Sequence, residues 1–307
     1  MNSQDRNNAI SGVLVIDKPT GMTSHDVVNV VRRGTGIRRA GHTGTLDPRA
    51  SGVLVVLVGP AVRLSEYISA SDKRYQAILR LGTATDTYDA EGVFTREEVT
   101  VEVTEEEFEV ELKKFEGEIE QVPPAYSAVK VNGRKAYDMA RNGEEVELEP
   151  RLIQVHHLEV LEWANPEVVV DVHCSSGTYI RSLANDLGEV LGCGAYLVGL
   201  RRTKNGRFSL RDSVPLRKLK EAFEAGDWYK YLIPAAESLA DWPAIELDPD
   251  QVEDVRHGHR VPADPDADSE QMVRGVSQAG ELVALLKLED GAEGAPEWQP
   301  KKVFFTS

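Results

Sequence analysis

GHTGTLDPRASG, residues 41–52, leads directly into the apolar run VLVVLV at residues 53–58. An apolar, β-branched run of this length that ends at Gly59-Pro60 predicts a buried strand. A glycine-rich loop in front of a buried strand lets the backbone come close to a ligand. The carboxylate of Asp47 is therefore expected to be partly desolvated and to need a cationic or hydrogen-bonding partner. Taken alone, Asp47-Pro48 is typical of an ordinary turn.

Length and composition indicate a globular protein with one large core and an accessory domain. The chain has 307 residues, of which 41% are hydrophobic and 28% are charged. Residues 1–8 are polar and lack the pattern of a signal peptide, and no apolar run approaches the ~20 residues that span a bilayer. Cys174 and Cys193 stand far apart without metal-ligand spacing, which favours buried thiols in a reducing compartment. We therefore predict a cytoplasmic protein without membrane association.

The net charge of −16 argues against nucleic-acid binding until its distribution is considered. Residues 91–120 hold twelve acids and three bases, and residues 241–307 hold fifteen acids and six bases. These two blocks contribute −18 together, so the rest of the chain sums to +2. Residues 1–80 carry eleven bases and six acids, a net charge of +5. The part of the chain that contains residues 41–52 is thus mildly basic.

Hydrophobic patterning predicts alternating strands and helices, followed by a small β-rich module. Strands are predicted at residues 12–17, 75–81, 152–161, 168–174 and 197–202. Helices are predicted from an N-cap at Ser24 through Val31, at residues 104–115, from a strand-to-helix turn within residues 174–183 through residue 188, and at residues 214–225. A boundary near residue 238 separates residues 1–238 from residues 239–307. Candidate strands of the second part are residues 258–261, 271–277, 282–287 and 302–305.

Two groups of basic residues suggest contacts with nucleic acid. Arg38 and Arg39 precede the Asp47 loop, where phosphate contacts and an ordinary solvated surface are equally compatible with the pattern. Arg134, Lys135 and Arg141 lie with Tyr137 in residues 133–143, which follow a proline-rich element and which we expect to form a short helix. Bases beside an aromatic ring suit an RNA-gripping loop, but composition alone fits an exposed helix as well.

Residues 41–52, together with several other segments, resemble the TruB family of pseudouridine synthases. The shared segments are DKPTGMTS at residues 17–24, KRY at residues 73–75, QVPPAYSAVK at residues 121–130, GTYIR at residues 177–181 and LRR at residues 200–202. The resemblance covers roughly residues 11–210 and is thus no single-motif match. It implies an α+β fold with a mixed, largely antiparallel sheet, flanking helices and a central cleft. Residues 1–238 would form this catalytic domain, and residues 239–307 an RNA-binding, PUA-like domain.

The resemblance also implies roles for individual residues. Asp47 would be the catalytic nucleophile or base, with Arg181 as its countercharge. Tyr75 would stack on the base and assist proton transfer at C5, since a free tyrosine titrates near ~10 and is a poor unaided base. Tyr179 and Leu200 would form apolar walls. The RNA-binding set would be His42, Lys18, Arg38, Arg39, Arg134, Lys135, Arg141 and Arg202, with the ring of His42 taking the place of the flipped nucleotide.

Pseudouridine formation breaks the bond between base and sugar, turns the base and joins C5 to C1′, so it needs no electrons, metal or cofactor. Removing a base from its stack costs a few kcal/mol, least in a strained loop. This favours the TΨC arm of tRNA, the substrate that the resemblance implies, with uridine 55 as the target and the protein acting as a monomer without metal. The alternatives are a guide-dependent or rRNA-directed pseudouridine synthase, a non-catalytic RNA-binding or RNA-folding protein, and, more remotely, an aspartate-nucleophile hydrolase.

Overall fold

The computed structural model describes residues 10–127, 129–131, 133–267, 270–291 and 294–304. The polar N-terminus, Ala128 in the proline-rich element and Phe305 of the last predicted strand lie outside these residues. Two compact units divide the chain. Unit 1 comprises Met1–Leu46, Leu54–Ser69 and Arg211–Ser307, and unit 2 comprises Asp47–Val53 and Ala70–Leu210. Strand β3 (Ser51–Val58) passes from unit 2 into unit 1, and the Asp47 loop precedes it directly.

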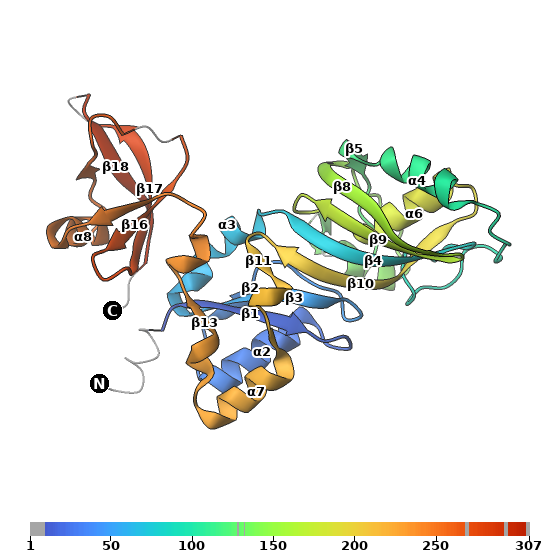
Figure 1. Cartoon of the computed structure of the whole chain (residues 1–307), viewed down its shortest axis with the longest axis horizontal. Helices are drawn as coiled ribbons and strands as arrows, with labels where there is room; N and C mark the ends of the chain where they lie inside the picture. The colour runs from blue at the N-terminus through green and yellow to red at the C-terminus, as the bar shows by residue number, and fades with distance from the viewer. Residues whose placement is uncertain (1–9, 128, 132, 268–269, 292–293, 305–307) are drawn as a thin grey trace. The chain divides into compact units, whose positions relative to one another are not determined.

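In unit 1, the N-terminal strand is at the centre of a small set of paired strands. β1 (Gly12–Lys18) pairs in parallel with β12 (Val214–Pro215) and antiparallel with β13 (Leu232–Pro234), and β2 (Ala40–His42) pairs antiparallel with the later part of β3. Helices α2 (Ser24–Thr35) and α7 (Leu216–Ala225) lie side by side in this unit (Figure 1). The apolar residues of β1 and the later part of β3 are fully buried, which accounts for their unbroken hydrophobic runs.

The N-terminus of α2 corrects one prediction from the sequence. Thr23, and not Ser24, is the N-cap: its hydroxyl accepts from the Asp26 amide, and the Asp26 carboxylate accepts from the Thr23 amide. Ser24 is the first helical residue and is buried. Its hydroxyl donates to the Leu46 carbonyl at 3.0 Å and accepts from the Leu46 amide at 2.8 Å. Ser24 thus anchors the backbone immediately before Asp47.

Unit 2 is built on a largely antiparallel sheet, as predicted. Its strand order is β10 (Ala195–Asn205), β4 (Lys73–Leu81), β9 (Glu167–Cys174), β8 (Arg151–Ala164) and β5 (Gly117–Gln121), with every neighbouring pair antiparallel. The first residues of β3 pair in parallel with β10, so the sheet is mixed. Helices α4 (Glu105–Lys113) and α6 (Ile180–Val190) cover it (Figure 1). Cys174 and Cys193 are buried free thiols.

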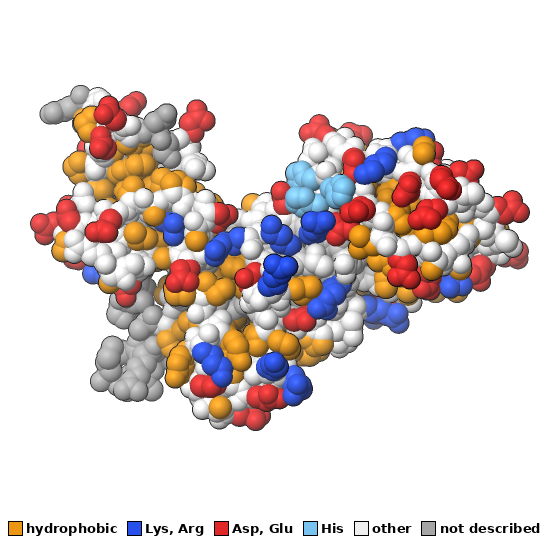
Figure 2. Space-filling model, in the orientation of Figure 1, with side chains coloured by type: hydrophobic (Ala, Val, Ile, Leu, Met, Phe, Trp, Pro, Cys, Tyr) orange, Lys and Arg blue, Asp and Glu red, His pale blue; other side chains and the backbone are white. Residues whose placement is uncertain are grey.

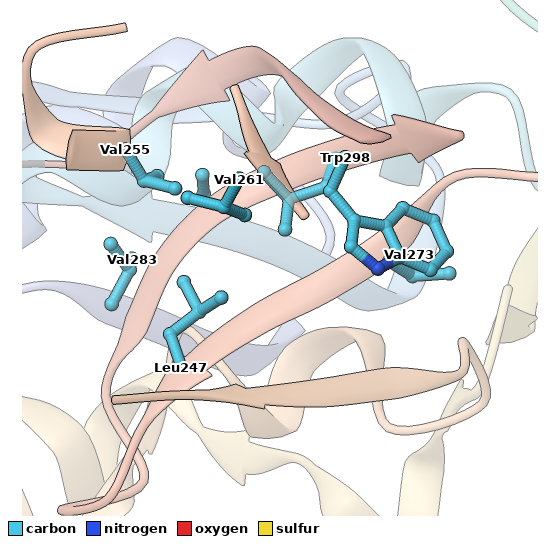
Figure 3. Close-up of a cluster of buried hydrophobic side chains, with 8 residues drawn as sticks. Leu247, Val255, Val261, Val273, Val283 and Trp298 are labelled. Carbon is cyan, nitrogen blue, oxygen red and sulfur yellow. The ribbon is translucent and has the colours of Figure 1, made fainter. Parts of the chain in front are cut away.

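The last part of the chain forms a five-stranded sheet with its own core. The strand order is β14 (Ala244–Leu247), β16 (Val273–Ser277), β17 (Leu282–Asp290), β18 (Pro296–Val303) and β15 (Val261–Pro262). Figure 3 shows Leu247, Val255, Val283 and Trp298 among the side chains that converge in this core. Val255 comes from helix α8 (Pro249–Arg256), which the sequence patterning did not predict. The β-rich character of this segment is confirmed.

The remaining elements are short. They are α3 (Ser65–Ser69), β6 (Lys130–Val131), β7 (Arg134–Lys135), α5 (Ala136–Arg141) and β11 (Phe208–Ser209), together with 3₁₀ turns at Gly59–Leu64, Leu210–Asp212, Trp228–Tyr231 and Glu237–Leu239. None of the helices in the described ranges combines the length and apolar character that a membrane crossing requires.

Candidate active site

Asp47 lies in the loop that opens unit 2, and its backbone carbonyl accepts from the Ala50 amide at 3.0 Å in a tight turn. Gly52, two residues after Ala50, has a φ of +99°, and a Cβ at this position would lie 2.2 Å from the carbonyl oxygen of Arg202. Only glycine allows β3 to approach β10 this closely. Gly52 therefore determines how closely the loop that carries Asp47 packs against β10. The Asp47 side chain itself stays 47% exposed.

Arg181 faces Asp47 from the first turn of α6. Its guanidinium Nε lies 3.3 Å from Asp47 Oδ2, and its Nη1 lies 3.3 Å from the Oδ2 of a second carboxylate, Asp89. Further donors of the same guanidinium reach the carbonyl oxygens of Tyr126, at 3.0 Å, and Thr87, at 3.4 Å. Only a tenth of the arginine side chain is exposed, so these partners replace the water that a buried cation loses.

Asp89 belongs to the site although the sequence patterning did not single it out. Its Oδ1 accepts from the Thr87 hydroxyl at 2.6 Å and from the Glu91 amide at 3.0 Å, which leaves Oδ2 for Arg181. The preceding residue, Tyr88, has a φ of +62°, a left-handed conformation that non-glycine residues rarely adopt. Such a local constraint in the backbone commonly accompanies a functional turn. The contact with Arg181 depends on a residue more than 90 positions away, and no local signal in the sequence reveals it.

A small pocket of about 30 Å³ lies over this charged group. It is lined by Asp47, Arg49, Ala50, Asp89, Ala90, Glu91, Arg181 and the β10 residues Leu197, Val198, Gly199 and Leu200. Arg49 and Glu91, both largely exposed, form an ion pair with 3.3 Å between Nε and Oε1. Three of the predicted site residues, Asp47, Arg181 and Leu200, thus line one pocket. Its lining combines the buried charge of Arg181 with apolar residues of β10.

Tyr75 lies on β4, opposite Arg202 on β10 and Val172 on β9. Burial raises the pKa of the Tyr75 phenol, while the charge and hydrogen bond of Arg202 act in the opposite direction. The phenol is therefore a neutral hydroxyl at physiological pH. Arg202 is itself 1% exposed, and its Nε donates to the Val53 carbonyl at 2.7 Å. Arg202 is therefore buried beside Tyr75. It is not at the surface, where a contact with an RNA phosphate would require it to be.

Tyr179 is the residue before α6 and is half-buried. Its amide donates to the Gln121 side-chain oxygen at 2.8 Å, and its carbonyl accepts from the Gln121 side-chain nitrogen at 3.0 Å. The amide side chain therefore takes the place of a capping residue, and it ties the entry of α6 to the proline-rich element that follows β5. Gln121 fixes the start of the helix that carries Arg181, a role that sequence patterning did not reveal.

The predicted RNA-binding residues of unit 1 fall into two environments. Arg38 and Arg39 are exposed ahead of β2, and His42 is half-buried at the end of β2, where its Nδ1 accepts from the Gly44 amide at 3.4 Å. Lys18, in contrast, is fully buried. Its ammonium group donates to the carbonyl oxygens of Met22, at 2.6 Å, and Pro19, at 3.0 Å, and so stabilises the loop before α2.

Arg134, Lys135 and Arg141 do not share a helix, which corrects the expectation for residues 133–143. Arg134 and Lys135 form strand β7 of a small hairpin with β6, and Arg141 ends α5. Gly133 at the hairpin turn has a φ of +82° and breaks the helical pattern. Arg134 makes a bidentate ion pair with Glu144, at 2.6 and 2.8 Å, and Arg141 donates to the Tyr137 hydroxyl at 3.0 Å.

Two family models match adjacent segments of the chain, which together cover residues 32–240. Residues 32–180 match the TruB family pseudouridylate synthase N-terminal domain, and residues 181–240 match the tRNA pseudouridylate synthase B C-terminal domain. Asp47 lies in the first segment and Arg181 begins the second, so the charged group described above draws on both.

Curated relatives cover nearly the whole chain. The tRNA pseudouridine synthase B of Solibacter usitatus strain Ellin6076 is 41% identical over 278 residues, 90% of this chain and 95% of that protein. The protein of the same name from Symbiobacterium thermophilum is 46% identical over 81% of this chain and 82% of its own length. That of Pseudomonas aeruginosa strain UCBPP-PA14 is 40% identical over 94% and 95%.

Solved structures agree with these matches. A Cbf5-Nop10-Gar1 complex includes a chain with a TM-score of 0.74 and 30% identity, which covers 96% of this chain and 85% of that chain. A chain in an H/ACA RNP bound to a substrate RNA containing 2′-deoxyuridine has a TM-score of 0.73 and 28% identity, with the same coverage. The family models, the curated relatives and the fold lead to one conclusion: the chain belongs to the TruB family of pseudouridylate synthases.

Proposed function

We propose that this protein converts uridine 55 in the TΨC loop of tRNA to pseudouridine, with Asp47 as the catalytic residue. The curated relatives named tRNA pseudouridine synthase B support tRNA as the substrate. The observation that carries the mechanism is the contact between Asp47 and the buried guanidinium of Arg181, inside a pocket with an apolar wall. This arrangement supplies an ionised carboxylate where water is partly excluded, as attack on a sugar carbon or removal of its neighbouring proton requires.

In this mechanism, Asp47 acts at the ribose, either by attack at C1′ or by removal of the 2′ proton. The N1–C1′ bond breaks, the uracil turns, and a C5–C1′ bond forms. C5 then loses its proton and N1 gains one, so the reaction is an isomerisation without redox change. Tyr75, a neutral hydroxyl beside the site, would stack on the base and assist the proton transfer at C5. Tyr179 and Leu200 would limit the positions that the detached base adopts.

Entry of the nucleotide requires side chains to move, because a pocket of about 30 Å³ holds about two water molecules. Arg49 and Glu91 are the lining residues best suited to move, since exposed ion pairs contribute only about 0–1 kcal/mol. An RNA phosphate that pairs with Arg49 would replace the contact with Glu91. Opening of the pocket would then accompany substrate binding.

RNA binding would use contacts spread over the chain. His42 would take the place of the flipped nucleotide, and Arg38, Arg39, Arg134, Lys135 and Arg141 would contact phosphates. The burial of Lys18 and Arg202 favours positioning of the loop before α2 and of Tyr75 in place of phosphate contacts. Residues 239–307 would form the PUA-like RNA-binding domain, and residues 1–238 the catalytic domain. We further propose that the protein acts as a monomer in the cytoplasm.

A guide-dependent synthase is the second candidate, since one of the similar solved chains comes from an H/ACA RNP bound to a substrate RNA. The higher identity to the tRNA enzymes, 40–46% against 28–30%, favours the first. The test is to incubate the purified protein alone with an unmodified tRNA transcript and to map pseudouridine by mass spectrometry. We expect conversion at position 55, and none in a transcript that carries cytidine there. Conversion that occurs only with an added guide RNA, or at another position, would contradict the proposal.

A further inference from the structure

A cluster of two histidines and one aspartate lies on the surface of unit 2, outside the pocket described above. Asp72 is in the turn before β4, His156 is on β8 and His173 is on β9. The Asp72 Oδ2 lies 3.1 Å from His156 Nε2 and 4.0 Å from His173 Nε2. The two imidazole rings are 4.7 Å apart between centroids. Figure 2 shows histidine side chains, in pale blue, gathered in one exposed patch.

A β-bulge in β8 lies at the cluster, where His156 and His157 together oppose His173 on β9. Val155 pairs with Cys174 and His157 pairs with His173, so His156 is an extra residue in β8 opposite His173. In a regular strand, alternate residues point to opposite faces, and an extra residue changes that alternation locally. Bulges recur where a side chain is aimed at a functional site. His156 of this bulge contacts Asp72 and lies against the ring of His173.

The backbone around all three residues is fixed. The Gln154 amide donates to the Ser175 hydroxyl at 2.9 Å, and the Ser175 amide donates to the Gln154 carbonyl at 2.8 Å, which secures β8 and β9 next to the bulge. The Asp72 carbonyl accepts from the Gly206 amide at 2.8 Å. The three side chains therefore extend from anchored positions and need little rearrangement to bind a ligand together.

The distances match those between ligands of one metal ion. With bonds of about 2.0–2.2 Å to nitrogen and oxygen, two ligands of the same ion lie roughly 3–4 Å apart. The Asp72–His156 and Asp72–His173 distances fall in this interval, and the donor atoms of all three residues lie within 4.8 Å of one another. A simple ion pair between His156 and Asp72 would account for the first distance but not for the approach of His173.

We propose that Asp72, His156 and His173 form a binding site for a divalent transition-metal ion of the zinc type. Two imidazoles and one carboxylate are a ligand set typical of Zn²⁺, with water completing the coordination. The bound ion would link the turn before β4 to the hairpin of β8 and β9, and so stabilise the strand that carries Tyr75.

A phosphate group is a less suitable occupant of the same place. The carboxylate of Asp72 lies within 4.0 Å of a nitrogen of each imidazole and would repel an anion. Two cations, Arg74 and Lys204, act on His173, and Arg74 is already paired with Asp171, with 2.7 Å between Nε and Oδ2. The charge arrangement therefore favours a cation in the cluster and leaves RNA phosphates to other surfaces.

The test is titration of Zn²⁺ into the tag-free, chelator-treated full-length protein by isothermal calorimetry, with the melting temperature measured at each metal concentration. We expect one ion per chain and a melting temperature that rises with metal concentration, because the ion binds only the folded state. His173→Ala and Asp72→Asn should each weaken binding by more than the about 10- to 100-fold that loss of an outer-shell partner costs. Circular dichroism confirms that each variant is folded, and His156→Gln provides a third variant if either is not.

His157→Ala is the matched control. This neighbouring histidine is similarly exposed, but its ring contacts Glu116 and Glu159 instead of the cluster. It should bind Zn²⁺ as the wild type does. Absence of binding at micromolar Zn²⁺, or binding that persists in the folded Asp72 and His173 variants, would overturn the proposal. So would an effect of these variants on the affinity for RNA without any effect on the metal, since that result would assign the cluster to phosphate binding.

Discussion

Arg181 lies between Asp47 and Asp89, with 3.3 Å to a carboxylate oxygen of each. The two carboxylates share one guanidinium that is almost fully buried, while Asp47 itself is about half-exposed. The arrangement holds a negative charge at the pocket and leaves one face of Asp47 accessible. Removing either carboxylate changes the charge balance around the arginine but has different consequences for the chemistry.

Asp47→Asn should abolish turnover and leave tRNA binding intact. The amide retains the size of the side chain but has neither the charge nor the nucleophilic oxygen, and a lost nucleophile has no substitute. Binding should persist because phosphate contacts are distributed over the surface. Tritium release from tRNA labelled at C5 of uridine measures turnover, and filter binding of the same RNA measures affinity. Wild-type tritium release by the variant would refute the role of Asp47.

Asp89→Asn should lower kcat with little change in KM, because the Oδ2 of Asp89 contacts Arg181 and so positions the partner of Asp47. We expect a reduction of about 10- to 100-fold, on the scale of other outer-shell partners. Asp86→Asn, in the same loop but with its carboxylate on the Val93 amide, is the control and should retain wild-type kcat. Equal losses in the two variants would show that the loop structure, and not the contact with Arg181, determines the rate.

The sequence predicted the Asp47 loop and its strand because their signals are local. Glycines, Asp-Pro and an unbroken apolar run appear within 18 residues, and the apolar run coincides with the single strand β3. The N-cap of α2 was misplaced by one residue because Thr23 and Ser24 are both good caps. The structure distinguishes them through Leu46, which binds the Ser24 hydroxyl from a distant part of the chain.

What the sequence could not predict depends on contacts between distant segments. Asp89 meets Arg181 only after β10 and the loop that follows β4 have paired at Leu197. The burial of Arg202 follows from its position opposite Tyr75 in the sheet. The histidine cluster draws on the turn before β4, on β8 and on β9, segments that only the folded sheet brings together.

Tyr75→Phe should retain RNA binding, reduce turnover and change the alkaline stability of the protein. Burial raises the pKa of Tyr75 in the folded state, so the unfolded chain loses this proton first as the pH rises above about 10. The wild type therefore loses free energy of unfolding above that pH, and the variant should lose less. Urea unfolding at pH 9, 10 and 11 measures the difference. Identical pH dependence in the two proteins would contradict the burial of an ionisable phenol.

A variant that ends after Ala240 should retain turnover on a T-arm stem-loop, with a higher KM. The removed segment has a core of its own, formed by side chains such as Leu247, Val283 and Trp298, and all residues that line the pocket remain. Its net charge of −9 indicates that it contributes local contacts more than general attraction to RNA. Steady-state kinetics with tRNA and with the stem-loop provide the comparison. Complete loss of turnover by a folded truncation would contradict this division of roles.

Neutralising Arg134, Lys135 and Arg141 together should weaken tRNA binding and reduce its salt dependence. Binding through fewer phosphate contacts releases fewer counterions from the RNA.

The ion pair between Arg134 and Glu144 leads to a further prediction. Glu144→Gln frees the guanidinium from a charged competitor and should strengthen binding at low salt. Glu221→Gln, which removes the partner of the exposed Arg217 on α7, is the matched control and should leave binding unchanged. Filter binding between 50 and 200 mM salt gives both affinity and slope. An unchanged slope in the triple variant, or equal effects of the two glutamate variants, would remove this segment from the RNA-binding surface.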